Sequence, residues 1–319
     1  MPLLNRLGLK GSRDAAVESG IPVTRGTALF APAEAWPVPS PEKRRAELLP
    51  ACANPRCASG WLHLWRSRAT PVFEGGWCCS AECTLEQVKA ALRREMVVRS
   101  VLRESHRHRI PLGLTMLEQG WITQQNLRAA LAAQRSAGRG RLGEWLIRQK
   151  SASEEMVTRA LGLQWGCPVL RMESYHPGNL TVLLPRFFVD AFGALPLRVA
   201  AGKLLYLGFE DRVDPALALA IERVTGLRVE AGLVEGSQFQ MAHTRALEAH
   251  YPAAELVEAA TEQALAAVLA GAIEEWRAVE ARLVRIHDCF WLLIWRRRQA
   301  GSMPEPASIR DLIASTAME

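Results

Sequence analysis

The sequence predicts an α+β protein, in which a tandem helical repeat is followed by a small three-stranded sheet with helices and preceded by a small cysteine module. Three observations lead to this fold class. Residues 111–134 recur without gaps as residues 141–164. Helix and strand patterns then follow in the order α-β-β-α-β-α, which predicts a small sheet with helices on one face. Five of the seven cysteines lie within residues 52–83.

Composition and charge narrow the class of protein. The chain has 319 residues, of which 49% are hydrophobic and 23% charged, values typical of a soluble globular protein with two or three domains. The net charge of +6 is mild, and suits either an anionic ligand or a solvated helix face. No apolar run approaches the roughly 20 residues needed to span a bilayer, and no signal peptide is recognisable, so we expect a cytoplasmic protein.

The first region, residues 1–48, is rich in proline, alanine and charge and has no sustained period, which predicts a mostly disordered leader. Residues 49–109 form the cysteine module and a basic helix. We expect Thr84 to cap this helix, because Gln87 stands three residues further on. Its basic end, residues 103–109, offers cations that suit phosphate, although a charged helix end is usually solvated.

The cysteine module predicts a structural zinc site and resembles a treble-clef zinc finger. Cys79 and Cys83 are four residues apart at the start of a helix, so both thiolates can face one metal, and the helix dipole favours their ionised form. A turn after Cys52 brings it near Cys57, which completes four sulfur ligands.

Two alternatives remain open for this module. Cys78 is one thiol too many, and either points away or, like His63, replaces a ligand. Reduced buried thiols without a metal would also fit the pattern. The isolated Cys167 and Cys289 are expected in the core.

Each copy of the repeat predicts a short helix, a turn and a longer helix. The longer helix begins at Thr123 in the first copy, and at Ser151 or Ser153 in the second. Gly120 fits a left-handed position after the first short helix, and Lys150 stands at the equivalent point of the second copy, where a left-handed conformation costs about 1 kcal/mol.

The α/β segment then predicts a helix near Pro185, two strands around an Ala-Gly turn, a helix from Asp214 to Gly226, a third strand and a closing helix. Residues 252–319 predict an alanine-rich helix over 253–276, a hairpin around His287, with a continued helix nearly as compatible, and a loose tail from Gly301. Whether this last region is separate or completes the central domain is open at this stage.

The doubled spacing R-L-G-x-x-L-x-x-x-G-x6-L-x-x-x-L-x-x-Q resembles the MshEN domain, the N-terminal domain of type II secretion and type IV pilus assembly ATPases, also called the GspE N-terminal domain. The resemblance covers residues 110–251, including the segment that begins LPLRVAAGKLLYLGFEDRVDP. It implies a bacterial regulatory domain that binds cyclic di-GMP, with one repeat for each half of the two-fold symmetric ligand.

The resemblance also implies the ligand-binding residues, and two departures qualify them. One half-site would contain Arg141, Leu142, Gly143, Leu146, Val157, Leu161 and Gln164, and the other Leu112, Gly113, Met116, Gly120, Leu127, Leu131 and Gln134. Pro111 replaces the first arginine of the motif, and Lys150 replaces the second glycine. Losing one guanidinium–guanine contact would cost about 1–3 kcal/mol, which Arg109 would partly compensate.

Three functions are compatible with these features. The first is a non-enzymatic regulatory protein that binds zinc and cyclic di-GMP and acts with secretion or pilus machinery. The second is a protein-interaction adaptor that keeps the fold without the nucleotide. The third, zinc-assisted nucleic-acid binding, depends only on the basic helix and the finger. The G-x-x-x-x-G-K-[ST] motif of nucleotide hydrolases is absent from these 319 residues, and no catalytic constellation is recognisable, so we expect no enzyme activity.

Overall fold

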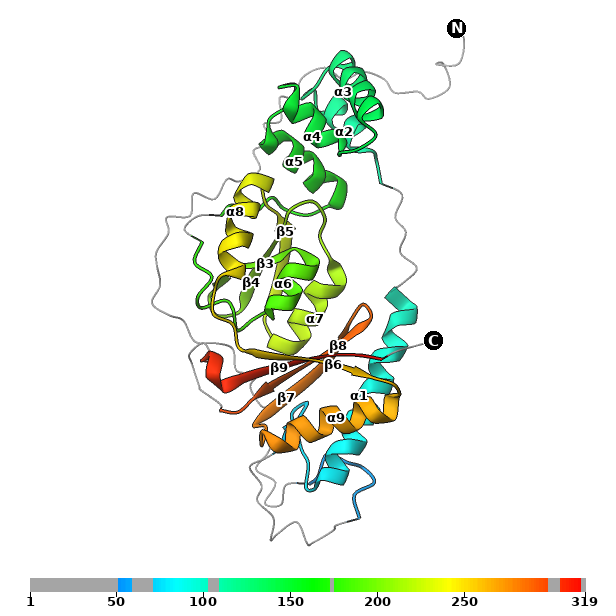
Figure 1. Cartoon of the computed structure of the whole chain (residues 1–319), viewed down its shortest axis with the longest axis vertical. Helices are drawn as coiled ribbons and strands as arrows, with labels where there is room; N and C mark the ends of the chain where they lie inside the picture. Colours follow the sequence, from blue (N-terminus) through cyan, green and yellow to red (C-terminus); the bar gives the residue numbers. More distant parts are fainter. Residues whose placement is uncertain (1–50, 59–70, 103–108, 173–174, 298–304, 317–319) are drawn as a thin grey trace, which may run out of the picture. The chain divides into compact units, whose positions relative to one another are not determined.

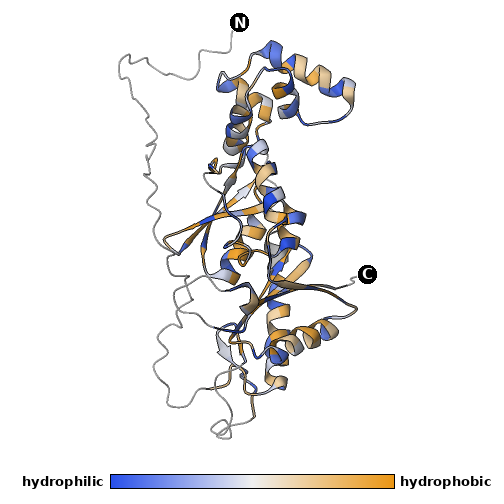
Figure 2. Cartoon of the chain, turned by 60° about the vertical axis from the view of Figure 1, so that its left-hand side comes forward, coloured by the Kyte–Doolittle hydropathy of each residue, from blue (hydrophilic) through white to orange (hydrophobic). Residues whose placement is uncertain are grey.

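The computed structural model describes residues 51–58, 71–102, 109–172, 175–297 and 305–316 (Figure 1). The leader at residues 1–48, His63 and the basic residues 103–108 lie outside the described part, so the predictions made for them stay predictions. Among the described helices, none is long and apolar enough to cross a membrane. Apolar and polar residues alternate along the helices (Figure 2), as expected for helices with one side on a core.

The tandem repeat folds into four helices (Figure 1): α2 (Leu112–Glu118), α3 (Gln124–Ala137), α4 (Leu142–Arg148) and α5 (Glu154–Trp165). Each short helix packs against the long helix of the other copy, α2 against α5 and α4 against α3. The two copies are therefore interlocked, and neither buries its apolar face alone.

The local signals of the repeat are confirmed. The side chain of Thr123 accepts a hydrogen bond from the Asn126 N–H, and that of Ser153 accepts one from the Met156 N–H, each at 3.2 Å. Ser153, rather than Ser151, is thus the second cap. Gly120 has φ of 68°, and the equivalent residue has φ of 55° although it is a lysine. Lys150 therefore occupies a position that favours glycine.

The following segment has the predicted order of elements: α6 (Arg186–Phe192), β3 (Ala194–Ala200), β4 (Leu204–Phe209), α7 (Pro215–Thr225), β5 (Arg228–Leu233) and α8 (Gly236–Leu247). The sheet order is β3-β4-β5, with β3 antiparallel and β5 parallel to β4. The Asp214 side chain caps α7 by accepting hydrogen bonds from two backbone N–H groups. The predicted α+β fold class is confirmed.

The C-terminal region contains more strands than the sequence predicts. It contains β6 (Ala253–Ala259), α9 (Glu262–Glu275), β7 (Glu280–Ile286), β8 (Cys289–Trp295) and β9 (Ile309–Thr316). The predicted hairpin around His287 is confirmed as β7–β8. The prediction of a helix from residue 253 is wrong for its first nine residues, seven of which form β6, and the prediction of a loose tail is wrong for β9. These two strands pair with each other in parallel across more than 50 residues of sequence, a partnership that local pattern does not reveal.

The cysteine module shares a sheet with this C-terminal region. Its hairpin consists of β1 (Val72–Phe73) and β2 (Gly76–Trp77), and β1 pairs in parallel with β7, which gives the sheet order β2-β1-β7-β8-β9-β6. Helix α1 (Ala81–Leu102) packs against α9, and side chains of both belong to one apolar cluster. The described residues of 71–97, 253–297 and 305–316 therefore fold around a common core.

Helix α1 starts earlier than predicted, so the assignment of Thr84 as its cap is wrong. The Ser80 hydroxyl accepts a hydrogen bond from the Cys83 N–H at 3.3 Å, whereas Thr84 is fully buried within the helix. Its hydroxyl lies 2.5 Å from a carboxylate oxygen of Glu274 on α9. Thr84 therefore joins α1 to α9.

A buried carboxylate joins α1 to two further elements. Glu95 has 1% of its side chain exposed, and accepts hydrogen bonds of 2.8 and 2.6 Å from Arg223 of α7 and one of 3.0 Å from Arg94. The backbone N–H of Arg285 in β7 donates to it at 3.3 Å. Burial alone raises the pKa of Glu95, but the hydrogen bonds and charges of Arg223 and Arg94 outweigh it, so its pKa lies below the usual value.

Candidate functional sites

The two copies of the repeat make reciprocal contacts around a pseudo-two-fold axis. The Gln134 side chain, at the end of the first copy, donates to the carbonyl of Gly140, just before the second copy, at 2.8 Å. The Gln164 side chain, at the end of the second copy, donates to the carbonyl of Ile110, just before the first copy, at 2.7 Å. The glutamine at the end of each copy thus holds the backbone just before the other copy. The two hydrogen bonds are equivalent under the pseudo-two-fold axis.

The two motif glycines obey the same symmetry. A Cβ atom on Gly113 would lie 2.7 Å from a methyl carbon of Leu127 and 3.1 Å from one of Leu142. A Cβ atom on Gly143 would lie 2.7 Å from a methyl carbon of Val157 and 3.7 Å from one of Leu112. Close packing of the helices therefore requires both glycines, whether or not a ligand also approaches them.

The predicted ligand-binding residues divide into buried and accessible groups. Those buried inside the repeat are Gly113, Met116, Gly143, Leu146 and Val157. Those partly accessible are Leu112, Leu127, Leu131, Gln134, Leu142, Leu161 and Gln164, and those exposed are Arg109, Gly120 and Arg141. The partly accessible and exposed residues can contact a ligand directly, whereas the buried residues pack between the helices and hold those helices in position.

Arg141, the motif arginine of the second copy, forms an ion pair with Asp211 in the loop between β4 and α7. Sequence reasoning missed Asp211, because it lies 70 residues further along the chain and belongs to no repeated motif. A second contact fixes the repeat to the α/β segment: the Glu154 carboxylate accepts hydrogen bonds of 2.6 and 2.7 Å from the backbone and hydroxyl of Ser237 at the start of α8. The second half-site thus combines residues of both segments.

A cavity of about 1060 Å³ is bordered by α2, the end of α5, the start of α7 and the turn between β7 and β8, and Arg109 and Gln164 are the predicted ligand-binding residues that line it. The guanidinium carbon of Arg109 lies 3.3 Å from the ring centroid of Trp165, and that of Arg212 lies 5.5 Å from the same ring. Among the other lining residues, the His287 ring lies 2.5 Å from the Asp214 carboxylate.

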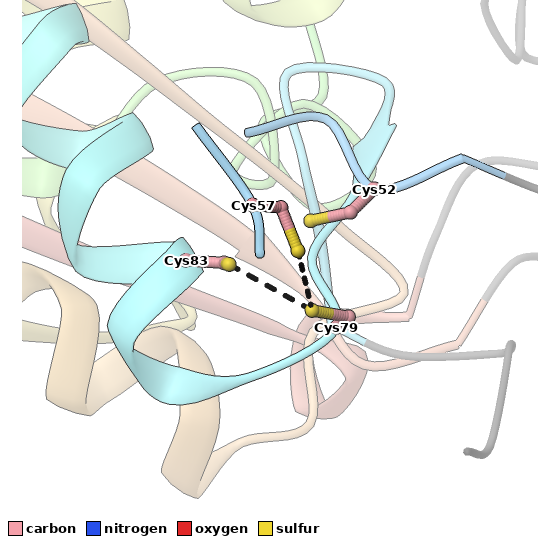
Figure 3. A group of neighbouring side chains, drawn as sticks. All are labelled: Cys52, Cys57, Cys79 and Cys83. Atoms are coloured by element: carbon pink, nitrogen blue, oxygen red, sulfur yellow. Dashed lines mark hydrogen bonds between the residues drawn. The ribbon is translucent and has the colours of Figure 1, made fainter. Parts of the chain in front are cut away.

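The structure brings the four predicted zinc ligands together (Figure 3). The sulfur atoms of Cys52, Cys57, Cys79 and Cys83 all lie within 4.8 Å of one another, with separations of 3.4 Å between Cys57 and Cys79 and 3.7 Å between Cys79 and Cys83. Four sulfurs placed tetrahedrally at about 2.3 Å from a zinc ion would be about 3.8 Å apart. The donor set and its geometry therefore fit zinc.

The surroundings of the sulfurs also fit a metal centre. The Asn54 side chain donates to the Cys83 sulfur at 3.4 Å, the type of outer contact that orients a thiolate ligand. Burial raises the pKa of the Cys52 thiol to about 12, so a nearby cation is needed to hold the group ionised. Cys78 is buried outside the four-sulfur group, and Cys167 and Cys289 pack against the larger core as predicted.

Comparisons with known proteins match about half of the chain. No family model matches it. It is 31% identical over 175 residues to bacteriophage adsorption protein B of Escherichia coli, which covers 52% of this chain and 22% of that protein. It is 31% identical over 144 residues to the type IV pilus assembly ATPase PilB of Thermus thermophilus, which covers 44% and 16%.

Two solved structures also match. A structure of MshE with cdg is 27% identical, with a TM-score of 0.35, over 43% of this chain and 99% of that one. The N-terminal domain of XpsE is 18% identical, with a TM-score of 0.30, over 42% and 92%. The chain spans less than a quarter of the length of the curated relatives, and it is therefore similar in sequence to one part of a pilus assembly ATPase and of a phage adsorption protein.

Proposed function

We propose that this chain is a non-enzymatic regulatory protein whose helical repeat binds cyclic di-GMP and which acts with type II secretion or type IV pilus machinery. The observation that carries the proposal is the pseudo-two-fold repeat, in which one motif arginine stands beside a carboxylate. The sequence similarity to a pilus assembly ATPase supports the link to that machinery.

The paired charges of Arg141 and Asp211 suit a guanine base. A guanidinium donates two hydrogen bonds to the O6 and N7 atoms of guanine, and a carboxylate accepts from the N–H groups on its opposite side. The partly accessible side chains of Leu112, Leu142 and Leu161 supply apolar surface on the repeat. A two-fold symmetric dinucleotide would present one base to each copy of the repeat.

The matching position of the first copy is Pro111, which cannot donate a hydrogen bond, so the two half-sites differ. This loss, together with Lys150, is the specific observation that favours the second candidate, an adaptor that keeps the fold and contacts a partner protein without nucleotide. A measurement of the affinity for cyclic di-GMP distinguishes the nucleotide-binding protein from the adaptor.

Calorimetric titration of the zinc-loaded chain with cyclic di-GMP tests the proposal. We expect a dissociation constant in the micromolar range or tighter, about tenfold or more weaker in Arg141→Ala. Arg135→Ala is the matched control, since Arg135 is an exposed arginine of the same repeat on α3, and it should bind as the parent does. Absence of heat with the parent chain would reject the nucleotide sensor and leave the adaptor.

We further propose that Cys52, Cys57, Cys79 and Cys83 hold a structural zinc ion that stabilises the start of α1 and its hairpin. A closed set of four thiolates leaves no position open for a substrate, so the role is structural. Metal analysis should find one zinc per chain, lost in Cys57→Ser and kept in Cys78→Ser. Equal zinc content in the two variants would contradict this assignment.

A further inference from the structure

The cavity bordered by α2 and the end of α5 contains two cations that converge on one indole. Arg109 enters from the residues just before α2, and Arg212 enters from the loop between β4 and α7. Both lie over the ring of Trp165, which is the last residue of α5. The volume of about 1060 Å³ is just above the range of about 300–1,000 Å³ typical of ligand pockets.

Neither guanidinium pairs with a carboxylate among the described residues. Two acidic residues line the cavity, Glu118 and Asp214. One carboxylate oxygen of Asp214 accepts two backbone N–H bonds at the start of α7 and the other lies against His287, so its charge is already compensated. Glu118 is exposed. The positive charges of Arg109 and Arg212 therefore remain available to an anion.

Adjacent residues of the loop between β4 and α7 contact two parts of the repeat. Asp211 pairs with Arg141 at the start of α4, while Arg212 lies over Trp165 at the end of α5. Arg109 stands two residues before Pro111, and the carbonyl between them accepts the hydrogen bond from Gln164. Of the predicted ligand-binding residues, Arg109 and Gln164 line the cavity, which therefore adjoins the start of α2 and the end of α5.

We infer that Arg109 and Arg212, arranged about Trp165, bind a phosphodiester group of the nucleotide, and so offset the loss of positive charge at Pro111 in the first copy of the repeat. The inference depends on the proposed function, because the ligand is the same cyclic dinucleotide. A phosphodiester carries one negative charge and two acceptor oxygens, which two guanidinium groups from different segments can share. The contact would also tie the repeat to the start of α7.

The competing explanation is that the two arginines only pack on the indole and stabilise the fold. Stacking of an arginine on tryptophan is common and needs no ligand. The two explanations differ in what Arg212→Ala changes: a packing role alters the melting temperature and leaves the affinity, whereas a ligand-binding role lowers the affinity of a chain that is still folded.

The test is calorimetric titration of cyclic di-GMP into the full zinc-loaded chain and into Arg212→Ala, Arg109→Ala and the control Arg135→Ala, each checked by thermal unfolding. We expect each of the first two to bind about tenfold to hundredfold more weakly, and the control to bind as the parent does.

The outcomes separate this inference from the proposed function. If the parent binds and Arg212→Ala matches the control, the inference is overturned while the proposed function stands. If the parent does not bind, both are overturned. Weaker binding in Arg212→Ala with an unchanged melting temperature supports the inference, and a weakened Arg212→Lys, which keeps the charge but loses the planar fork, would show that bidentate geometry matters.

Discussion

Replacing Asp311 with asparagine should stabilise the C-terminal region increasingly as the pH rises. Asp311 lies in β9 with only 3% of its surface exposed, and its carboxylate accepts a 2.8 Å hydrogen bond from the indole N–H of Trp291, which is fully buried in β8. No cation contacts the carboxylate among the described residues. Burial raises its pKa to about 7, and the hydrogen bond from Trp291 offsets only part of that rise.

The magnitude follows from the difference between folded and unfolded states. Asp311 has a pKa of about 7 when folded, against about 3.9 in the unfolded chain. Because Asp311 ionises at a lower pH in the unfolded chain than in the folded one, the free energy of unfolding decreases as the pH rises from about 3.9 to about 7. Below this range ionisation has no effect, and above it the decrease is constant. At about 1.4 kcal/mol per pH unit, the total reaches roughly 4 kcal/mol, of which about 2 kcal/mol develops between pH 5.5 and pH 8.5.

Urea unfolding of the zinc-loaded parent and Asp311→Asn across that range measures this difference. Asparagine keeps an acceptor for the indole but cannot ionise, so its advantage over the parent should grow by about 2 kcal/mol from pH 5.5 to pH 8.5. The change with pH is the decisive quantity, because the new amide group adds a constant offset. A difference that stays constant with pH would refute the reasoning.

Three further substitutions test the packing. Glu95→Gln keeps the shape of the side chain but removes the charge shared with Arg223, and should lower the free energy of unfolding in urea by about 1.5–3 kcal/mol above pH 5. This loss should shrink as the pH falls below about 4.3, because the Glu95 carboxylate then becomes protonated in the unfolded chain. The control Glu155→Gln, at an exposed position, should change the free energy of unfolding very little. Gly143→Ala should cost about 1–2 kcal/mol because β-branched Val157 cannot move aside; a gain in thermal stability would exclude the close contact. Lys150→Gly should raise the unfolding free energy by about 0.5–1 kcal/mol, and a loss would argue against strain at this position.

The elements that sequence predicted well depend on local signals. The repeat, its two side-chain caps and the capped helix α7 all follow from residues within a few positions of one another. The zinc ligands belong to the same class, because Cys79 and Cys83 lie one helical turn apart and sulfur is chemically distinctive. In these places the composition of a short segment specifies its conformation.

The elements that sequence missed depend on distant partners. Six of the seven residues of strand β6 are alanine, glutamate or leucine, which favour helix, and the strand forms because β9 pairs with it. The two-residue strand β1 joins the cysteine module to the C-terminal sheet through β7, and no local pattern marks that pairing. Asp211 and Arg212 could not be predicted as site residues for the same reason, because they contact the repeat only through the folded position of their loop.

The most direct test of the central claim, that the repeat and the loop before α7 form one site for cyclic di-GMP, is hydrogen–deuterium exchange of the full chain with and without the ligand. We expect slower exchange at residues 110–113, 141–146 and 210–214, and unchanged exchange in strands β6 and β9. Unchanged exchange in all three segments at saturating ligand, or protection confined to the cysteine module, would contradict it.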